Sequence, residues 1–289
     1  TGIRDVVGKR AGELVAHIEL HWLDAMTQAY QTGEPTRTEG YHAALNRWLT
    51  LHFSRIGGAG SKLVSVVFRN ITERKQREQY QAFLLKLNDA LRPLRDSVEV
   101  QRAAARVIGE YAGVDRAYYV AIEPDFEHWA VADNYVREGV PPLIVKGWRL
   151  ADFGWTRDEL AAGRMVRIAD SETDPNLSEA ARASFRGANT RAALALPLMK
   201  KGRWAASFVL HQLRPHEWTE EEVKLAQETA ERTWAAVERA KAEAALQDNQ
   251  AQLTELNTQL EQRVAERTQA LHEHLQLLGQ AEAVAELGS

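Results

Sequence analysis

The sequence contains no cysteine among its 289 residues. This absence excludes disulfide bridges, thiolate metal ligands, cysteine nucleophiles and any chromophore attached through a thioether bond. No apolar run approaches the ~18 residues that a membrane-spanning helix requires, and no signal peptide opens the chain. The formal net charge of -4 and the pI near 6.2 give no reason to expect nucleic acid or an anionic membrane as a partner. We therefore expect a soluble, cytoplasmic protein.

Catalytic motifs are also lacking from the sequence. It contains no GxSxG elbow, no P-loop and no HExxH, and its nine histidines show no metal-ligand spacing. We therefore expect this segment to be no enzyme and to hold no metal, while any non-covalent cofactor is unknown. The chain begins at Thr1 without a methionine and stops in Gly288-Ser289, so we expect a segment of a longer protein.

What the sequence does contain is a long stripe of leucines near its C-terminus. From Leu253 the stripe advances in steps of three, four and four residues, with Arg267 at its one polar position. An eleven-residue repeat predicts a nearly straight or slightly right-handed coiled coil. Burying each leucine is worth roughly 1.5 to 3 kcal/mol, so we expect a parallel homodimer. The predicted seam comprises Leu246, Asn249, Leu253, Leu256, Leu260, Val264, Leu271, Leu275 and Leu278.

Two properties of this stripe bear on its interpretation. The alternative is a final helix packed on its own domain, but a polar-flanked stripe of over thirty residues without proline is more typical of a coiled coil. A buried amide at Asn249 would fix the register and the number of strands at some cost in stability. Together with Arg267, it would leave the seam weak enough to change its packing.

The first third of the chain predicts a helix, a hairpin and a second helix. The helix covers residues 11–32, the hairpin joins Arg47–Ile56 to Lys62–Phe68, and the second helix runs from Asn70 to about Leu94. The segments TGEPTRTEGY, ALNRWLTLHF and VVFRNITERK resemble the C-terminal half of a PAS sensor domain. The resemblance covers residues 1–75, and residues 76–95 would be a connecting helix.

Two departures from the PAS pattern are visible. Asn70 stands where the family usually has Asp, so its side chain can cap the following helix without carrying a charge. The family's first two strands would precede Thr1, and a sheet that lacks them would expose apolar surface and an unpaired edge.

A second domain is predicted from about residue 96. The strand RAALALPL at 191–198, the short glycine turn after it and the helix start WTEE at 218–221 resemble a GAF domain, which would cover residues 96–235. Residues 236–289 would then be a signalling coiled-coil helix. The fold class expected for the whole is α+β, with antiparallel sheets flanked by helices. Within the second domain we predict helices at 98–111, 158–163 and 178–187, and strands at 116–122, 128–136, 143–150, 165–168, 192–199 and 203–210.

The GAF resemblance implies a pocket for a small molecule or chromophore. The alternative is that the aromatic residues simply form the core. The Asp-Ile-Pro motif of bilin sites and the Asn-Lys and Phe-Asp-Glu pattern of cyclic-nucleotide sites are both absent. Arg191 and Arg149 could meet an anionic ligand, although lone arginines usually form surface ion pairs. The candidate pocket residues are Tyr119, Trp129, Trp148, Phe153, Trp155 and His211.

The C-terminal sequence suggests the output. Residues 260–268 and 280–288 resemble the segment that enters the dimerisation helix of a sensor histidine kinase. By that resemblance the phosphorylated histidine would follow Ser289, because His272-Glu273 lacks the Arg and Pro that continue the kinase pattern. We expect a sensory and dimerisation module that acts on a response regulator through the kinase part. The alternatives are a ligand-free dimerisation scaffold and the sensor segment of a cyclic-di-nucleotide enzyme.

Overall fold

The computed structural model describes residues 19–58, 60–123, 125–143 and 149–287, without the side chains of residues 273–274 and 276–287. The chain divides into two compact units, Thr1–Leu85 and Lys86–Ser289. The fold is α+β, with a small N-terminal antiparallel sheet, a larger antiparallel sheet flanked by helices and a long C-terminal helix. None of the described helices is both long and apolar enough to cross a membrane.

The first unit is a three-stranded sheet with one helix packed on it. The strands lie in the order β1-β2-β3 and are antiparallel, which confirms the predicted hairpin. Trp22 and Ala29 pack on apolar side chains of β2. The sequence prediction missed β1, and residues 11–18 of the predicted first helix lie outside the described residues. The elements are α2 (Leu20–Thr32), β1 (Thr36–His42), η1 (Ala43–Leu45), β2 (Arg47–Ile56), β3 (Leu63–Asn70) and α3 (Thr72–Leu91), whose residues from Lys86 onward belong to the second unit.

Asn70 caps α3 as its sequence predicts. Its Oδ1 accepts hydrogen bonds from the Thr72 backbone N–H at 3.0 Å and from the Thr72 hydroxyl at 2.7 Å. The helix ends at Leu91, before the predicted end at Leu94. Pro93 explains the difference, because a proline disfavours helical geometry in the residue that precedes it.

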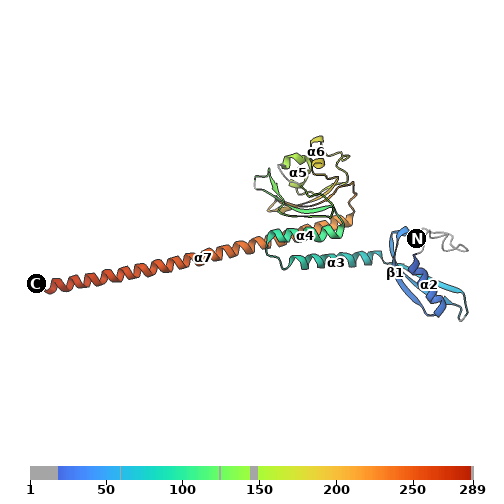
Figure 1. Cartoon of the computed structure of the whole chain (residues 1–289), viewed down its shortest axis with the longest axis horizontal. Helices are drawn as coiled ribbons and strands as arrows, with labels where there is room; N and C mark the ends of the chain where they lie inside the picture. The colour runs from blue at the N-terminus through green and yellow to red at the C-terminus, as the bar shows by residue number, and fades with distance from the viewer. Residues whose placement is uncertain (1–18, 59, 124, 144–148, 288–289) are drawn as a thin grey trace. The chain divides into compact units, whose positions relative to one another are not determined.

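The second unit is built around a sheet in the order β5-β4-β9-β8-β7, with β6 also paired to β4. The helices α4 and α7 cover one face, while α5 and α6 lie on the other (Figure 1). The elements are α4 (Ser97–Ala112), β4 (Arg116–Ile122), β5 (Trp129–Ala130), β6 (Asn134–Val136), η2 (Leu150–Phe153), α5 (Trp155–Ala161), β7 (Val166–Ile168), α6 (Glu179–Gly187), β8 (Ala192–Lys200), β9 (Arg203–Gln212) and α7 (Glu220–Leu287).

Two predicted strands differ from the observed structure. The strand expected at 128–136 is split into β5 and β6. Ala130 pairs with Ala121 and Asn134 pairs with Tyr118, so the three residues 131–133 stand opposite two residues of β4, and the extra residue interrupts the ladder. Of the strand expected at 143–150, Leu150 belongs to the 3-10 helix η2, and residues 144–148 lie outside the described residues.

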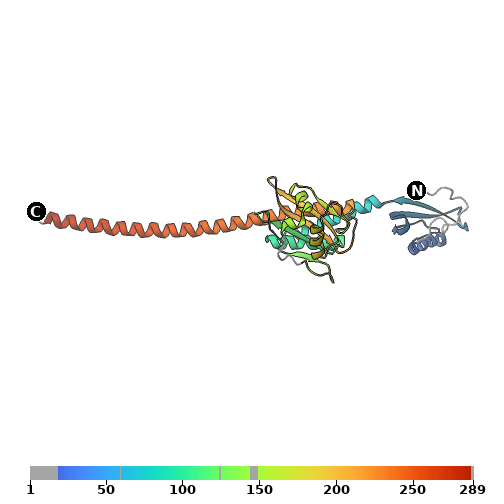
Figure 2. The ribbon, with the colours of Figure 1, turned by 90° about the horizontal axis from the view of Figure 1, so that it is seen from above.

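The helix α7 contains 68 residues and runs without interruption to Leu287 (Figure 2). It begins with the predicted capping box: the Thr219 hydroxyl accepts from the Glu222 N–H at 3.2 Å, and the Glu222 carboxylate accepts from the Thr219 N–H at 2.7 Å. The described apolar side chains of the predicted seam, from Leu246 to Leu275, are 48% to 63% exposed. No described residue of this chain covers the stripe, and the predicted coiled coil stays a prediction.

Candidate ligand cavity

A mostly apolar cavity lies on the face of the large sheet that is turned away from α4 and α7. Its empty volume, counted out to its open mouth, is about 680 Å³, and the centre of a water-sized sphere can reach about 80 Å³ of it. The residues that line it are Tyr118, Val120, Trp129, Leu150, Phe153, Thr156, Arg157, Leu160, Val166, Phe185, Ala188, Ala193, Ala195, Trp204, Ser207, Val209 and His211.

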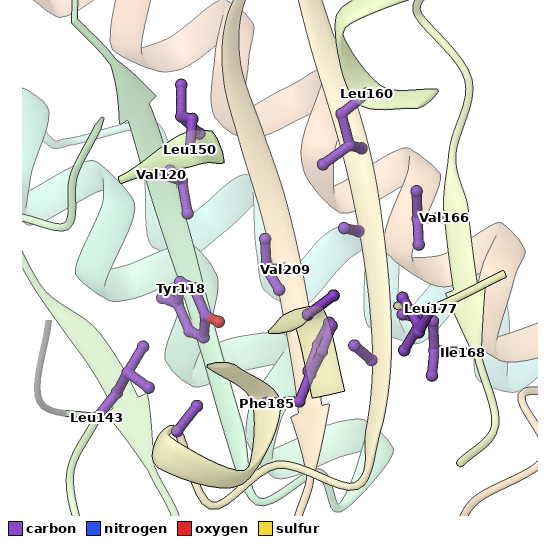
Figure 3. Close-up of a cluster of buried hydrophobic side chains, with 14 of the residues drawn as sticks. Tyr118, Val120, Leu143, Leu150, Leu160, Val166, Ile168, Leu177, Phe185 and Val209 are labelled. Carbon is purple, nitrogen blue, oxygen red and sulfur yellow. The ribbon is translucent and has the colours of Figure 1, made fainter. Parts of the chain in front are cut away.

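The cavity is framed by the hydrophobic cluster on that face of the sheet. Figure 3 shows Tyr118 and Val120 on β4 and Val209 on the adjacent strand, with Phe185 and Leu160 among the residues around them. The partly buried rings of Trp129 and Phe153, which also line the cavity, meet edge to face at 6.1 Å. Phe153 meets Phe185 in the same way at 5.8 Å. The walls are therefore aromatic and aliphatic, and they come from both the sheet and the covering helices.

His211 provides a polar group at the floor of the cavity. Its Nε2 lies 2.8 Å from the Tyr118 hydroxyl, and its Nδ1 lies 3.1 Å from the Thr190 hydroxyl. Burial, with a smaller contribution from the nearby Arg116 charge, lowers the pKa of His211 to about 3. Burial also raises the pKa of Tyr118 far above its usual value. Both groups are therefore uncharged at neutral pH and act as hydrogen-bonding groups.

Arg116 is fully buried beside this floor and is held by backbone oxygens. Its Nε and Nη2 donate to the Pro141 carbonyl at 3.0 and 2.8 Å, and its Nη1 donates to the Ala188 carbonyl at 2.8 Å. Burial lowers its pKa from the usual value. Each of the three guanidinium nitrogens thus donates to a backbone carbonyl, and Arg116 joins the backbone at Pro141 to the backbone at Ala188.

Thr156 contributes a different kind of polar group. This residue lines the cavity and is only 7% exposed, and its hydroxyl has no hydrogen-bond partner. Leaving a buried hydroxyl unpaired costs about 1 to 3 kcal/mol, so such groups are rare without a reason. The structure therefore places an unsatisfied hydroxyl, which can both donate and accept, in a mostly apolar space.

The predicted pocket residues are only partly brought together. Trp129, Phe153 and His211 line the cavity, while Trp155 packs against the surrounding cluster without lining it. Tyr119 lies on the opposite face of the sheet, because successive strand residues point to opposite faces and Tyr118 points into the cavity. The prediction for Tyr119 was wrong in this respect. Trp148 lies outside the described residues.

The two arginines considered for an anionic ligand do not line the cavity. Arg191 forms a two-pronged pair with Asp170, with nitrogen-oxygen distances of 2.8 and 2.7 Å. This hydrogen bonding lowers the pKa of Asp170. Arg149 donates its backbone N–H to Asp152 at 2.8 Å at the start of η2. Arg191 thus forms the ordinary ion pair given as the alternative in the sequence analysis.

Sequence reasoning missed Tyr118, Thr156 and Arg116. The strand RAYYVAI is apolar on both faces, so its pattern does not tell which tyrosine faces the cavity. The signal that could have found Tyr118 is the pairing of β4 with β9, which sets Tyr118 and His211 on one face. No sequence signal marks Thr156, because a single threonine in a short helix is ordinary.

One wall of the cavity is attached to the start of α7. Val166 of β7 lines the cavity, and the next residue, Arg167, donates to the Trp218 carbonyl and pairs with Glu220 at 2.7 Å. The Trp218 indole donates in turn to the Ile168 carbonyl at 3.1 Å. A displacement of β7 would therefore move the first turn of α7, because these hydrogen bonds join the two elements.

Among the described residues, one cluster could hold a metal ion: Glu123, Asp125 and His128, which are all exposed. His128 Nδ1 lies 2.6 Å from the Asp125 carboxylate. That hydrogen bond, with two backbone donors, lowers the pKa of Asp125 to about 2. The cluster is thus an ordinary surface ion pair, and we assign no site to it.

Residues 96–237 match the family model of the GAF domain, so this part of the chain is a GAF domain, a sensory and regulatory class. No curated protein matches the chain. Among solved structures, the PixJ GAF domain of Thermosynechococcus elongatus in its blue-light absorbing form is 19% identical, with a TM-score of 0.45 over 54% of this chain and 93% of that one. The chromophore-binding domain of the bacteriophytochrome RpBphP3 from R. palustris is 15% identical, with a TM-score of 0.46 over 79% of this chain and 83% of that one. At such low values, no property of these proteins is carried over to this chain.

Proposed function

We propose that this chain is the sensory and dimerisation module of a cytoplasmic signal-transduction histidine kinase. The GAF domain responds to a ligand in its cavity, and a parallel pair of α7 helices relays the response to a downstream kinase part and its response regulator. The first unit contributes the C-terminal part of a PAS domain. The segment itself relays the signal and catalyses no reaction.

One observation carries this proposal: α7 begins against a strand that lines the cavity and continues as one helix bearing an exposed leucine stripe. The contacts of Arg167 and Trp218 join β7 to the first turn of that helix. Beyond the GAF domain, Leu253 and Leu260 are 60% and 48% exposed. Since burying such side chains is worth about 1.5 to 3 kcal/mol each, a second copy of the stripe is the simplest cover.

The second candidate function is a constitutive dimerisation scaffold without a ligand. It shares the helix pair with the first proposal and differs only in the cavity, where an unpaired Thr156 hydroxyl favours a ligand over a filled core. A cyclic-di-nucleotide enzyme remains a further candidate for the output, because the same helix pair would serve it.

The orientation of the α7 pair can be tested by disulfide formation. The chain has no cysteine of its own, so single cysteines report on one position each. In a parallel, in-register pair, Leu246→Cys and Leu271→Cys each lie beside the same residue of the partner. Each variant is therefore expected to form a disulfide-linked dimer, seen by mass on a non-reducing gel, within minutes of mild oxidation.

Gln262→Cys is the matched control, because residue 262 lies on the side of α7 opposite the stripe and should remain unlinked under the same oxidation. If neither single variant links but a mixture of the two does, the helices are antiparallel. If no variant links and the mass in solution stays at 32.5 kDa, the chain is a monomer. Either result contradicts the proposal.

A further inference from the structure

We propose that the GAF cavity binds a small, uncharged aromatic molecule with a single hydroxyl or carbonyl group. This inference rests on the sensory function proposed above and specifies the chemical class of its ligand. Three properties of the cavity support it: the charge of its lining, the arrangement of its rings and the position of the unpaired Thr156 hydroxyl.

The lining carries little charge. Among the described lining residues only Arg157 carries a charge; its guanidinium lies 3.3 Å from the Asp158 carboxylate and is 44% exposed. The buried Arg116 does not line the cavity, and each of its three guanidinium nitrogens donates to a backbone carbonyl. A carboxylate or ammonium group would lose its hydration without gaining a dedicated partner, which costs far more than binding returns.

The rings that line the cavity favour an aromatic ligand. Trp129, Phe153 and Phe185 form a chain of edge-to-face contacts, with centroids 6.1 and 5.8 Å apart. Aromatic pairs in this geometry gain about 0.5 to 1.5 kcal/mol beyond the burial of their surface. A further ring that enters the cavity can continue this chain, whereas an aliphatic ligand would gain only the burial.

The polar group of the ligand has a defined partner. The Thr156 hydroxyl is buried and unpaired, and a hydroxyl can both donate and accept. A ligand hydroxyl or carbonyl would satisfy it and remove its desolvation cost. At the floor, the Tyr118 oxygen contacts His211 and retains a lone pair, so it can accept from a second donor.

The open space sets the size. The centre of a water-sized sphere reaches about 80 Å³, several times the ~10 to 15 Å³ that one water needs. Pockets for drug-sized ligands enclose about 300 to 1,000 Å³, and the full hollow of about 680 Å³ includes its open mouth. A molecule of one or two rings fits these limits, and the chain has no cysteine to tether a bilin through a thioether.

The test measures binding of three probes to the full chain by calorimetry: phenol, toluene and benzoate. They share one ring and differ in the group it carries. We expect phenol to bind more tightly than toluene, and benzoate to show no binding. Because Trp129 and Trp204 line the cavity, phenol should also change the tryptophan fluorescence.

Substitutions at Thr156 separate a ligand contact from general packing. Thr156→Val should weaken phenol binding about 5- to 10-fold and leave toluene binding unchanged, because only the hydroxyl is lost. Thr156→Ser retains the hydroxyl and should restore phenol binding. Thr233→Val is the control: this threonine is equally buried, bonds to the Thr229 carbonyl and does not line the cavity.

The inference is overturned if benzoate binds as tightly as phenol, if Thr156→Val weakens phenol and toluene equally, or if none of the probes binds. These outcomes are independent of the disulfide pattern of α7. If the α7 helices form the expected disulfides but no probe binds, the proposed ligand class is refuted and the proposed dimeric relay is not. Bound phenol without a helix pair would refute the relay alone.

Discussion

At the scale of single residues, His211 shows how burial determines chemistry. The imidazole is 6% exposed, and its two nitrogens contact the hydroxyls of Tyr118 and Thr190. Hydroxyls can serve either as donors or as acceptors, so they pair with a neutral imidazole in either tautomer. The arrangement therefore stabilises the neutral ring, in agreement with the lowered pKa.

This lowered pKa predicts a dependence of stability on pH. The pKa of His211 is about 3 in the folded state, against ~6.5 in an unfolded chain. Between these values the unfolded chain binds a proton that the folded one does not, so the free energy of unfolding falls as the pH decreases. The slope is at most about 1.4 kcal/mol per pH unit, and the full stability is present above about pH 6.5. Urea unfolding followed by fluorescence, at several pH values between about 4 and 7, measures this slope.

The comparison is with His211→Gln, which removes the titrating group and should flatten the slope. His128→Gln serves as the control of opposite sign. Hydrogen bonding to Asp125 raises the pKa of the exposed His128, so that residue stabilises the folded state at low pH and loses this effect as the pH rises. An equal slope in the wild type and in His211→Gln would show that His211 does not remain neutral in the folded protein.

At the scale of elements, the helix α7 depends on its first turn. The Thr219 and Glu222 side chains satisfy backbone donors there reciprocally. Thr219→Ala should lower the free energy of unfolding by about 1 kcal/mol. Thr258→Ala, within the exposed part of the same helix, should be neutral or slightly stabilising, because alanine is the better helix former. Thermal unfolding of both variants tests this; equal effects would show that the capping box contributes nothing.

The elements were largely predictable from sequence where a local signal decides them. The capping box, the Asn70 cap and the pair β8 and β9 all follow from residue patterns within a few positions. β1 was missed because Thr36–His42 contains Gly40 and two charged residues, and it is a strand through its pairing with β2. β5 and β6 are separate because three residues, 131–133, stand opposite two residues of β4 between the pairs Ala121–Ala130 and Tyr118–Asn134, and the extra residue interrupts the ladder.

The candidate site was less predictable than the fold. Aromatic residues such as Trp129 and Phe153 were found by composition, yet Tyr119 was assigned to the wrong face. When both faces of a strand are buried, as in β4, apolar residues occupy every position and the alternation disappears. The unpaired state of the Thr156 hydroxyl depends on every neighbour in three dimensions, and no sequence pattern contains that information.

At the scale of the whole molecule, the sensor and the scaffold differ in one measurable quantity. If phenol in the cavity and the packing of α7 are linked, then locking the helices must change the affinity for phenol, since coupling is reciprocal. We expect the phenol dissociation constant to differ about 5-fold or more between reduced and disulfide-linked Leu271→Cys. Gln262→Cys treated with the same oxidant controls for oxidation itself. Equal affinities in both states would favour the scaffold.

The pairing of β4 with β9 also has a consequence for how the chain is made. Tyr118 and His211 are 93 residues apart in sequence, yet they belong to neighbouring strands. At about 5 to 20 residues per second, synthesis separates the two strands by roughly 5 to 20 s. During that interval Ala117 and Tyr119 on β4 lack β9 beside them, and the nascent GAF domain is at its most vulnerable to aggregation. The first unit, whose strands are close neighbours in sequence, can fold well before that interval ends.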